Sequence, residues 1–310
     1  MPAGNMFEKA PAGARRARDT SADDNFHRQE RAAMNDLISV LISIYNRPDA
    51  LDAVLRGLSR QTDRNFEVIA SDDGSPPSTA TVVQSWKDRI GVPFTHVWHE
   101  HRGFRASEIS NRAILKSRGA YCVFLDGDCI PRPGFVAAHR RLAEPGWFVF
   151  GNRILMNDAL TRACLHDGVE PETWSFADFV RRRREINRLT PLVSLPLGPL
   201  RKLGTQSWES VRTCNLAAWR ADLDKVNGQE GLYVGWGPHD SDLAVRLIRS
   251  GCRRKDGRFA TGVLHLAHPE ADRERMMENK LLFEETLASN RVRAVRGLAE
   301  ASAEAVVEAN

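Results

Sequence analysis

The chain has 310 residues, a hydrophobic fraction of 42% and a formal net charge of +4. This length and composition suit one large α/β domain or two small ones with a sizeable core. The mild positive charge does not by itself indicate nucleic-acid binding, and no apolar run approaches the roughly 20 residues of a transmembrane helix. The five cysteines form no CxxC pair, which favours buried thiols in a reducing compartment over a disulfide frame or a zinc site.

The amino-terminal residues lack the apolar core of a signal peptide, so we expect a cytoplasmic protein. Residues 1–35 show no apolar periodicity and are expected to be a disordered tail. Positive charge is concentrated in the run from Arg181 to Arg184. A solvated helix face is one interpretation of this run. The other is contact with an anionic acceptor or with the inner membrane, which would make the protein peripheral to it.

Four short apolar segments predict strands at residues 37–44, 66–70, 94–98 and 121–125. Helical patterns lie between them, beginning near Pro48, Ser78 and Gly103. This alternation predicts right-handed crossovers and a Rossmann-like, mostly parallel sheet flanked by helices. No GxGxxG or GxxxxGK[ST] motif follows a predicted strand, which disfavours dinucleotide binding and P-loop chemistry.

The pattern is weaker after residue 131. We expect helices at 135–142, 238–249 and 270–287, strands at 147–152, 211–218 and 262–266, and a helical and loop insertion at 156–206 whose second half is a loop. One domain would span 36–290 and end in a carboxyl-terminal helix. Its nucleotide-binding half would be 36–131, and its acceptor and catalytic half would be 132–290. Residues 291–310 would form a frayed tail.

The stretch YCVFLDGDCIP at 121–131 is the most informative segment. Its hydrophobic run stops at Asp126-Gly127-Asp128, which predicts a buried strand that delivers two carboxylates to a crevice at the sheet edge. Carboxylates are hard oxygen ligands for Mn²⁺ or Mg²⁺. The same spacing recurs in the pair Asp222 and Asp224 and in the pair Asp240 and Asp242, so spacing alone is weak evidence. The buried strand before Asp126 is what supports a metal site at this pair.

Two clusters follow the neighbouring strands. Asp73, after the second strand, can accept a hydrogen bond from a uracil imide or a ribose hydroxyl, or it can simply cap an Asp-Gly turn. The segment HRGFR at 101–105 precedes Asn111. Arg105 has a planar fork of donors suited to a diphosphate or a uracil carbonyl, and the alternative is a solvated arginine in a loop.

Two more clusters lie in the second half. In GWGPHDSD at 235–242, Trp236 can stack on a sugar ring. Asp240 in the first turn of a helix should stay ionised and can act as a general base, although acids are common at helix starts. Either His265 or His268 could complete a metal site begun by Asp128, while a single histidine is more often structural.

The blocks YNRP, SDDGS, GFRASEISNRAI, DGD, GWGPHDSDLAVRL and HLAH occur in this order within residues 37–285. This order resembles family 2 glycosyltransferases of the GT-A fold. The GFR…N, DGD and GWG…D blocks are most similar to bacterial chondroitin polymerase domains and to β-1,4-galactosyltransferases. They are also similar to enzymes that extend lipopolysaccharide or capsule glycans.

The resemblance implies an inverting enzyme that depends on Mn²⁺ or Mg²⁺ and moves a sugar from a UDP-sugar to a hydroxyl of a glycan or glycolipid. It also implies a role in the synthesis of bacterial cell-surface polysaccharide or lipopolysaccharide, with no nucleic-acid partner. It also implies a role for each matching residue. Asp240 would be the catalytic base, and the metal would bind Asp128 and His265, with His268 as the alternative. The nucleotide-sugar would contact Tyr45, Arg47, Asp73, Arg105, Asn111, Asp126 and Asp128, and the sugars would contact Trp236, Gly237 and His239.

One departure concerns the residue before the base, where relatives typically carry glutamate and this chain has His239. A catalytically impaired nucleotide-sugar-binding protein is therefore the main alternative. A nucleotidyltransferase would need a glycine-rich triphosphate loop with a basic residue after the first strand, and YNRP is a poor match. A basic membrane- or nucleic-acid-binding module would leave the DGD, GWG…D and HLAH blocks unexplained. The sequence does not indicate the donor sugar, the linkage or the oligomeric state.

Overall fold

The computed structural model describes residues 36–269 and 272–308, so the tail expected at 1–35 lies outside the described residues. A seven-stranded sheet has the order β3-β2-β1-β4-β8-β6-β9, in which only β8 runs antiparallel to its neighbours. Its strands are β1 (Ile38–Ile44), β2 (Phe66–Asp72), β3 (Phe94–Trp98), β4 (Tyr121–Asp126), β6 (Trp147–Phe150), β8 (Asn215–Trp219) and β9 (Arg253–Asp256).

Helices cover both faces of this sheet. The α-helices of the described residues are α2 (Pro48–Ser59), α3 (Pro77–Lys87), α4 (Ala106–Lys116), α5 (Phe135–Leu142), α6 (Asp158–His166), α7 (Phe176–Arg181), α8 (Arg220–Lys225), α9 (His239–Arg249), α10 (Met276–Ala288) and α11 (Leu298–Glu308). Among the described residues, no helix combines the length and apolar composition needed to cross a bilayer. The predicted α/β class with a mostly parallel sheet is confirmed.

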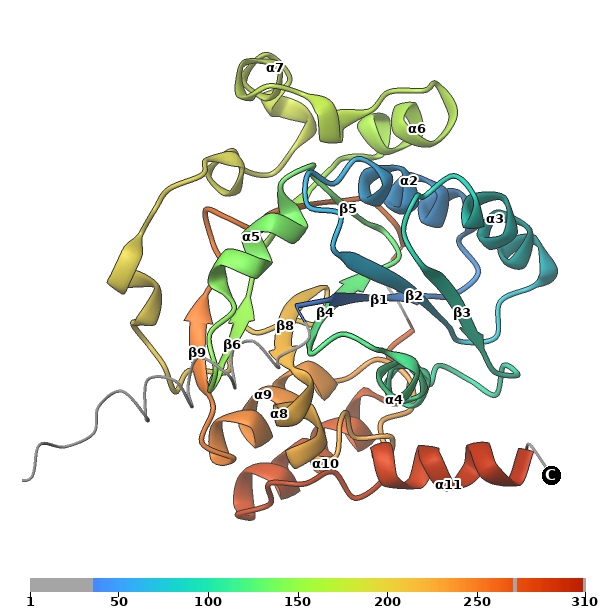
Figure 1. Ribbon diagram of the computed structural model, residues 1–310, viewed down its shortest axis with the longest axis vertical. Coiled ribbons are helices and arrows are strands. Elements are labelled where there is room, and N and C mark those ends of the chain that lie inside the picture. Colours follow the sequence, from blue (N-terminus) through green and yellow to red (C-terminus); the bar gives the residue numbers. More distant parts are fainter. Residues whose placement is uncertain (1–35, 270–271, 309–310) are drawn as a thin grey trace, which may run out of the picture. The chain divides into compact units, whose positions relative to one another are not determined.

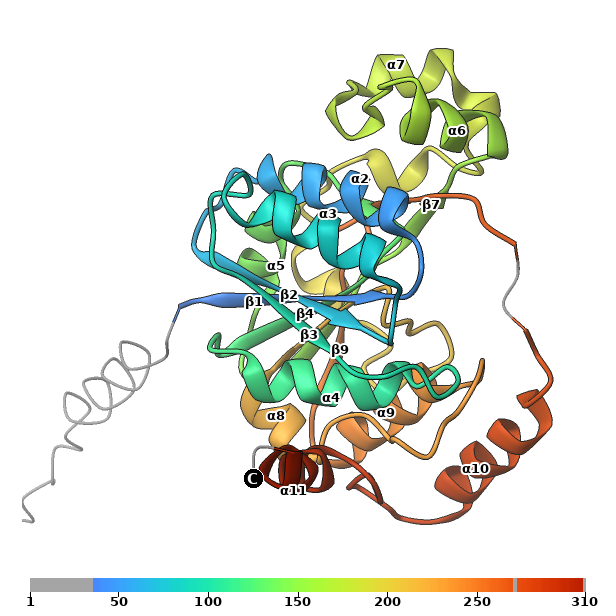
Figure 2. The same ribbon diagram turned by 90° about the vertical axis from the view of Figure 1, so that its right-hand side faces the viewer.

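Side chains of successive strand residues point to opposite faces, and this produces two cores. Val40 and Ile42 of β1 pack in the core covered by α2, α3 and α5. Leu41 packs in the other core, with residues of α4, α8 and α9. Figures 1 and 2 show α2 and α3 on one side of the strands and α4 and α9 on the other. Because both faces are covered, the central strands are apolar throughout, as expected for buried parallel strands.

The strand register sets the position of the polar strand ends. Ile44 pairs with Asp72, and Ser43 pairs with Asp126, so β1, β2 and β4 end level with one another. Proline at the first turns of α2 and α3 starts the return helices immediately after these ends. Residues that follow the three strands therefore lie along one edge of the sheet, where open α/β sheets bind ligands.

A second, three-stranded sheet brings the carboxyl-terminal half to this edge. It consists of β5 (Cys129–Pro131), β10 (Val263–His265) and β7 (Arg153–Leu155), with β10 in the middle. In the antiparallel pairing of β10 with β5, His265 lies opposite Cys129, and the Leu266 amide donates to the Asp128 carbonyl at 3.0 Å. This pairing joins the HLAH block to the DGD block, although the two lie far apart in the sequence.

The insertion at 156–206 contains more regular structure than the sequence indicated. It forms α6, α7 and the 3-10 helices η1 (Pro171–Thr173), η2 (Arg183–Glu185), η3 (Thr190–Leu192) and η4 (Gly198–Lys202), so its second half is not a plain loop. Buried Leu160 and Phe179 attach it to the first core. Within the arginine run, Arg181 pairs with Asp178 on an exposed surface, as expected for a solvated helix face.

The expectation of a frayed tail from residue 291 is wrong for the part that the structure describes. Helix α11 packs on α4, and Leu298 and Ala301 are about 95% buried. The buried Glu230 carboxylate accepts hydrogen bonds from the amides of Val295 and Arg296 at 2.7 and 3.0 Å. The Ala- and Glu-rich composition suggested a solvated end, but these long-range contacts order it.

A buried ion pair inside α9 is expected to dominate local stability. Arg246 and Asp242 have fully buried side chains, and Arg246 Nε donates to Asp242 Oδ2 at 2.7 Å. We predict that Asp242→Ala lowers the free energy of unfolding by about 3–5 kcal/mol, because it leaves a buried guanidinium without its counter-charge. Urea unfolding measures this loss. The matched control is Asp224→Ala, which breaks an exposed pair of the same spacing with Arg220 and should cost about 1 kcal/mol or less. Equal losses in the two variants would contradict the prediction.

Candidate active site

The two carboxylates of the DGD block are held against the end of β1. The Gly127 amide donates to the Ser43 carbonyl at 2.8 Å. A Cβ atom at position 127 would lie 2.6 Å from Ile44 Cγ2 and 2.8 Å from the Ser43 carbonyl oxygen. Only glycine allows this close approach, so the residue between the two acids fixes where Asp126 and Asp128 lie.

Two imidazoles lie beside the second acid. His265 Nε2 is 3.5 Å from Asp128 Oδ1, and His268 Nε2 is 3.3 Å from Asp128 Oδ2. The ligand atoms of the three residues lie within 4.8 Å of one another. His268 Nδ1 lies 2.6 Å from the Pro269 carbonyl, which fixes the proton on Nδ1 and leaves the Nε2 lone pair for a ligand. Carboxylate and imidazole are suitable donors for Mn²⁺.

The protonation of the neighbouring groups fits a cation at this place. Burial raises the pKa of Asp126 well above its usual value, and the charges of Asp128 and Asp240 raise it further. Burial lowers the pKa of His265 to about 4, so its imidazole is neutral at physiological pH, as a metal ligand must be. Carboxyl groups that repel one another, next to the neutral imidazole of His265, form a set that a divalent cation would stabilise.

A second group of potential ligands, formed by Asp126, Cys129 and Cys214, lies next to the first. Burial raises the pKa of the Cys129 thiol, so it stays protonated. A protonated thiol is a poor ligand, and sulfur suits softer metals than Mn²⁺ or Mg²⁺. The set of Asp128 with the two histidines is therefore the better metal site.

Helix α9 places the candidate base at the same edge. Thr213 Oγ1, just before β8, donates to Asp240 Oδ1 at 2.5 Å, and His239 Nε2 lies 3.2 Å from the same oxygen. The Asp240 side chain is 16% exposed, so solvent or an acceptor can reach it. Asp240 lies in the first turn of α9, as the sequence predicted.

The loop before α9 is held in place by α10. The buried Asn279 of α10 donates to the carbonyls of Val234 and Trp236, both at 2.9 Å. A Cβ atom at Gly237 would lie 2.6 Å from Asn279 Cβ, so the glycine allows α10 to approach. Trp236 is 40% exposed, and the Arg273 guanidinium lies 5.1 Å from its ring centre. The loop therefore presents an accessible aromatic ring, as the sugar-stacking role requires.

Tyr45 and Arg47, which follow β1, lie at the same edge of the sheet as the acids. Tyr45 stacks on His101 with ring centres 4.6 Å apart, and its hydroxyl lies 3.2 Å from His101 Nε2. Arg47 pairs with Asp49 at 3.3 Å and acts electrostatically on His265. The structure thus brings Tyr45 and Arg47 to the edge that carries the acids, and their contacts with a nucleotide-sugar stay predictions.

Asp73 is almost fully buried and already has partners. Its Oδ1 lies 2.6 Å from His99 Nε2, and its Oδ2 accepts the Arg105 amide at 2.7 Å. The Arg105 guanidinium donates to Glu108 Oε1 at 2.9 Å and to the Glu100 carbonyl at 2.6 Å. Burial opposes protonation of His99, but the Asp73 and Glu108 carboxylates outweigh it and raise the pKa of His99. These contacts fix the backbone around the predicted uridine corner.

This network predicts a pH effect on stability. His99 first, then Arg105 and Arg296, hold the pKa of Glu108 at about 2, below its ordinary value of 4.5. A carboxylate whose pKa is lower in the folded state stabilises fully above pH 4.5 and loses this contribution as the pH falls toward 2. We therefore expect the wild type to exceed Glu108→Gln in free energy of unfolding at neutral pH, and the difference to shrink below pH 4.5. Urea unfolding at a series of pH values measures it, and a difference independent of pH would contradict the assignment.

Asn111 lies away from the strand ends. It is 1% exposed, its Nδ2 donates to the Gln229 carbonyl at 2.8 Å, and its Oδ1 accepts the Gln229 amide at 2.8 Å. These paired bonds join α4 to the segment before the GWG loop. The geometry thus supports a structural role, and the predicted contact of Asn111 with a nucleotide-sugar has no support from it.

Sequence reasoning missed several residues that shape the site. Arg153 Nη1 lies 3.3 Å from His265 Nε2, and Thr213, His99 and Asn279 hold the residues described above. Arg153 and Thr213 lie in short strands or at their ends, where periodicity is too weak to detect. His99 directly follows a predicted strand, and that position was the one signal that could have identified it.

The sheet order and the cluster of acids and histidines at its edge place this chain in the GT-A class of α/β folds. The family model for glycosyl transferase family 2 matches residues 39–202, which is more than half of the 310 residues, and the chain belongs to that family. A second model, described as the N-terminal domain of galactosyltransferase, matches residues 202–277. The resemblance seen in the motifs is confirmed.

Curated relatives and solved structures agree with this assignment. The chain is 31% identical to validoxylamine A glucosyltransferase of Streptomyces hygroscopicus over 78% of its own length and 57% of the relative's. It is 21% identical to chondroitin synthase of Escherichia coli over 70% of its length and 33% of that protein.

TarS of Staphylococcus aureus in complex with UDP-GlcNAc superposes with a TM-score of 0.55 at 14% identity, covering 85% of this chain and 69% of the other. The mannosyltransferase PcManGT of Pyrobaculum calidifontis, solved with GDP-Man and Mn²⁺, has a TM-score of 0.52 at 17% identity and coverages of 88% and 74%. The chain thus spans only a third to somewhat more than half of these curated relatives.

Proposed function

We propose that the chain is a metal-dependent, inverting glycosyltransferase that moves a sugar from a UDP-sugar to a hydroxyl group of a glycan acceptor. The observation that carries the proposal is the meeting of Asp128, His265 and His268 in one set of ligand atoms, with Asp126 and Asp240 nearby. Five residues from three distant blocks converge on one edge, as donor binding and base catalysis require.

Asp128 with His268, His265 or both would hold the divalent cation, and the cation would stabilise negative charge on the departing diphosphate. Arg153 and Arg47, both close to His265, add positive charge where that diphosphate would lie. Asp126 would then contact the ribose or the donor sugar. The Asp73 corner, fixed by His99, would position the uracil.

Asp240 would take the proton of the acceptor hydroxyl. The hydroxyl oxygen then attacks the anomeric carbon as the bond from that carbon to the UDP oxygen breaks, and one displacement inverts the configuration. Thr213 holds Asp240 through the 2.5 Å hydrogen bond, and the exposed ring of Trp236 would support the acceptor or donor sugar. No covalent nucleophile is needed in this sequence of steps.

The names of the relatives support a hexosyl transfer, since they include a glucosyltransferase and polysaccharide synthases. The solved neighbours carry UDP-GlcNAc in one case and GDP-Man with Mn²⁺ in another, so the base of the donor needs a direct test. A bacterial cell-surface glycan as the product, a cytoplasmic location and membrane contact through Arg181 to Arg184 remain predictions.

The decisive experiment is a screen of UDP- and GDP-sugars for hydrolysis or transfer by the purified chain, with Mn²⁺ and with EDTA. Nucleotide release that depends on Mn²⁺ and on one UDP-sugar is the expected result. Tight UDP binding without any release would instead support the impaired binding protein suggested by His239. Release that is unchanged in EDTA would contradict the metal-dependent mechanism.

A further inference from the structure

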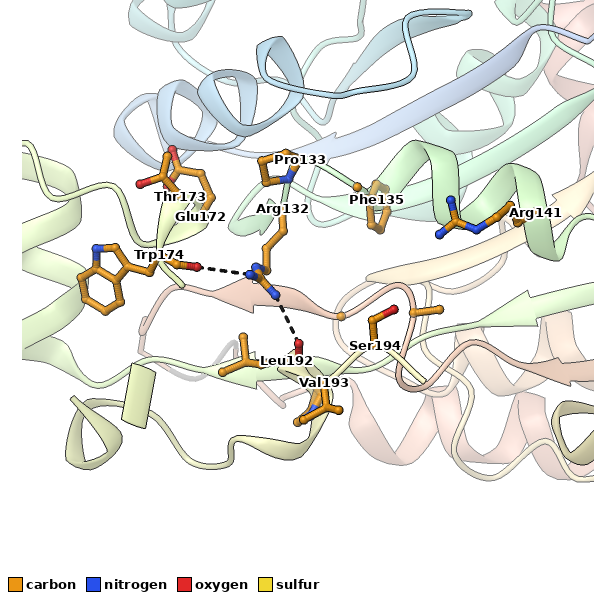
Figure 3. A pocket seen from close by; sticks show the side chains of 14 residues that line it. Arg132, Pro133, Phe135, Arg141, Glu172, Thr173, Trp174, Leu192, Val193 and Ser194 are labelled. Carbon is orange, nitrogen blue, oxygen red and sulfur yellow. Dashed lines mark hydrogen bonds between the residues drawn. The ribbon is translucent and has the colours of Figure 1, made fainter. Parts of the chain in front are cut away.

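A cavity of about 350 Å³ lies against the insertion, at the far end of β5 from the acid pair (Figure 3). Its walls come from residues 132–135, 172–174, 191–194 and the loop that precedes β10. The three residues of β5 lie between Arg132 and Asp128, and at 3.3 Å per residue the four steps from one to the other span roughly 13 Å. The cavity is therefore distinct from the candidate active site, and its volume suits a sugar-sized molecule.

Arg132 brings an incompletely paired positive charge to this cavity. Its guanidinium donates to the carbonyls of Trp174 at 3.2 Å and Leu192 at 3.3 Å, as the dashed lines in Figure 3 show. Its Nε is buried without a hydrogen-bond partner, and no carboxylate forms an ion pair with it within the described part of the chain. Burial accordingly lowers the pKa of Arg132. The half-buried guanidinium also lies 5.7 Å from the centre of the Phe179 ring, but that contact supplies no counter-charge, and an anion would supply one.

Glu172 brings an unused acceptor to the same cavity. It is 1% exposed, and its Oε1 accepts from Arg56 Nε at 2.8 Å and Arg60 Nη1 at 3.0 Å. Its Oε2 is buried and has no partner among the described residues. Two buried polar atoms, one a donor and one an acceptor, thus remain unmatched on residues that line one cavity. Such atoms are rare in folded proteins because each costs free energy.

We propose that this cavity binds a carboxylate-bearing sugar, such as a hexuronate, or a hydroxy acid of similar size. The ligand carboxylate would pair with Arg132, and a ligand hydroxyl would donate to Glu172 Oε2 once that buried side chain shifts toward the cavity. Phe135 and Leu192 supply apolar walls for the carbon face of the ring, and the exposed Arg141 adds positive charge at the rim. The acid could be one residue of a glycan chain or a free molecule, because both offer the same chemistry.

The test is calorimetry on the full chain with glucuronate, glucose and inorganic phosphate. We expect glucuronate to bind about tenfold or more tightly than glucose, since hydrogen bonds to charged groups contribute this much. Arg132→Gln should remove the preference. The control, Arg181→Gln, makes the same charge change on exposed α7 of the same insertion and should retain it.

Because Arg132 joins two loops, a second variant keeps the proposal testable if Arg132→Gln fails to fold. Gly134 lines the cavity, has φ −92°, and has open space within 4 Å of a Cβ atom, so Gly134→Leu adds volume without strain. It should abolish glucuronate binding and lower the melting temperature by only a few degrees, because Gly134 is also the N-cap of α5 and leucine is a poorer cap. Glucuronate that binds no better than glucose or phosphate, or that still binds to Gly134→Leu, would overturn the proposal.

Two further measurements separate the possible sources and the two proposals. A glucuronate-terminated oligosaccharide that binds more tightly than free glucuronate would assign the cavity to a glycan chain, and equal binding would assign it to the free acid. UDP binding in Mn²⁺, measured on the same samples, should be the same in wild type and Gly134→Leu. A failure of the cavity proposal thus leaves the transferase proposal untouched, and the reverse also holds.

Discussion

Asp240→Asn is expected to lower the turnover number by about 10²–10⁴-fold, as for loss of a general base. The amide keeps the shape of the carboxylate and can still accept the Thr213 hydrogen bond, so the local structure should persist. UDP affinity in Mn²⁺ should stay near the wild-type value, because the base acts on the acceptor. Steady-state kinetics with the best donor from the screen, together with UDP calorimetry, separate the two effects.

A matched control for this variant is Asp158→Asn. Asp158 is also an acid in the first turn of a helix, α6, but it lies outside the site. It should change neither turnover nor UDP affinity. Near wild-type turnover in Asp240→Asn would remove this residue from the role of base. A parallel loss of UDP affinity would mean that it positions the donor instead.

Asp128→Ala is expected to weaken UDP binding in Mn²⁺ by about 10–100-fold or more, because metal affinity falls by that factor even when only an outer hydrogen-bonding partner is lost. In EDTA the variant and the wild type should bind UDP equally weakly. The expected result follows from the central position of Asp128, whose two oxygens face the two histidines at 3.5 and 3.3 Å. Calorimetry of UDP in both buffers measures it.

The control for Asp128→Ala is an aspartate from another pair with the same spacing. Asp224 belongs to a second pair of aspartates one residue apart, but it lies on α8 and pairs with Arg220 on the surface. Asp224→Ala should leave UDP binding unchanged. If Asp128→Ala also binds UDP with wild-type affinity in Mn²⁺, then Asp128 is not a metal ligand and the proposed mechanism fails.

The first half of the fold could be predicted because its signals are local. Each strand from β1 to β4 is a short segment that ends in a polar turn, and the carboxyl ends of neighbouring parallel strands lie at one edge of the sheet. The position of Asp126 and Asp128 follows from that rule. The need for Gly127 could not be predicted, because it arises from the contact with Ser43 and Ile44 on another strand.

The second half depends on pairings between distant residues. His265 reaches Asp128 because β10 pairs with β5, and the sequence predicted the strand at 262–266 but not its pairing partner. Arg153 enters through β7, which is a strand of three residues. The role of Asp242 in a buried pair with Arg246, close to the partly exposed Asp240, could not be predicted from the spacing of the acids. The sequence pattern identified the GWG…D block, but only the tertiary packing distinguishes the structural Asp242 from the candidate base Asp240.

The segment that precedes α11 contacts the residues around the predicted uridine corner at Asp73. Arg296 Nη2 lies 3.7 Å from Glu108 Oε2, and Glu108 in turn binds the Arg105 guanidinium beside Asp73. A chain cut after residue 290 would keep every recognisable motif. It would nevertheless lack α11, which packs on α4, and the amides that donate to the Glu230 carboxylate. We therefore expect a chain cut after residue 290 to be less stable than the full chain, and shortened forms used for crystallisation or expression should keep this final helix.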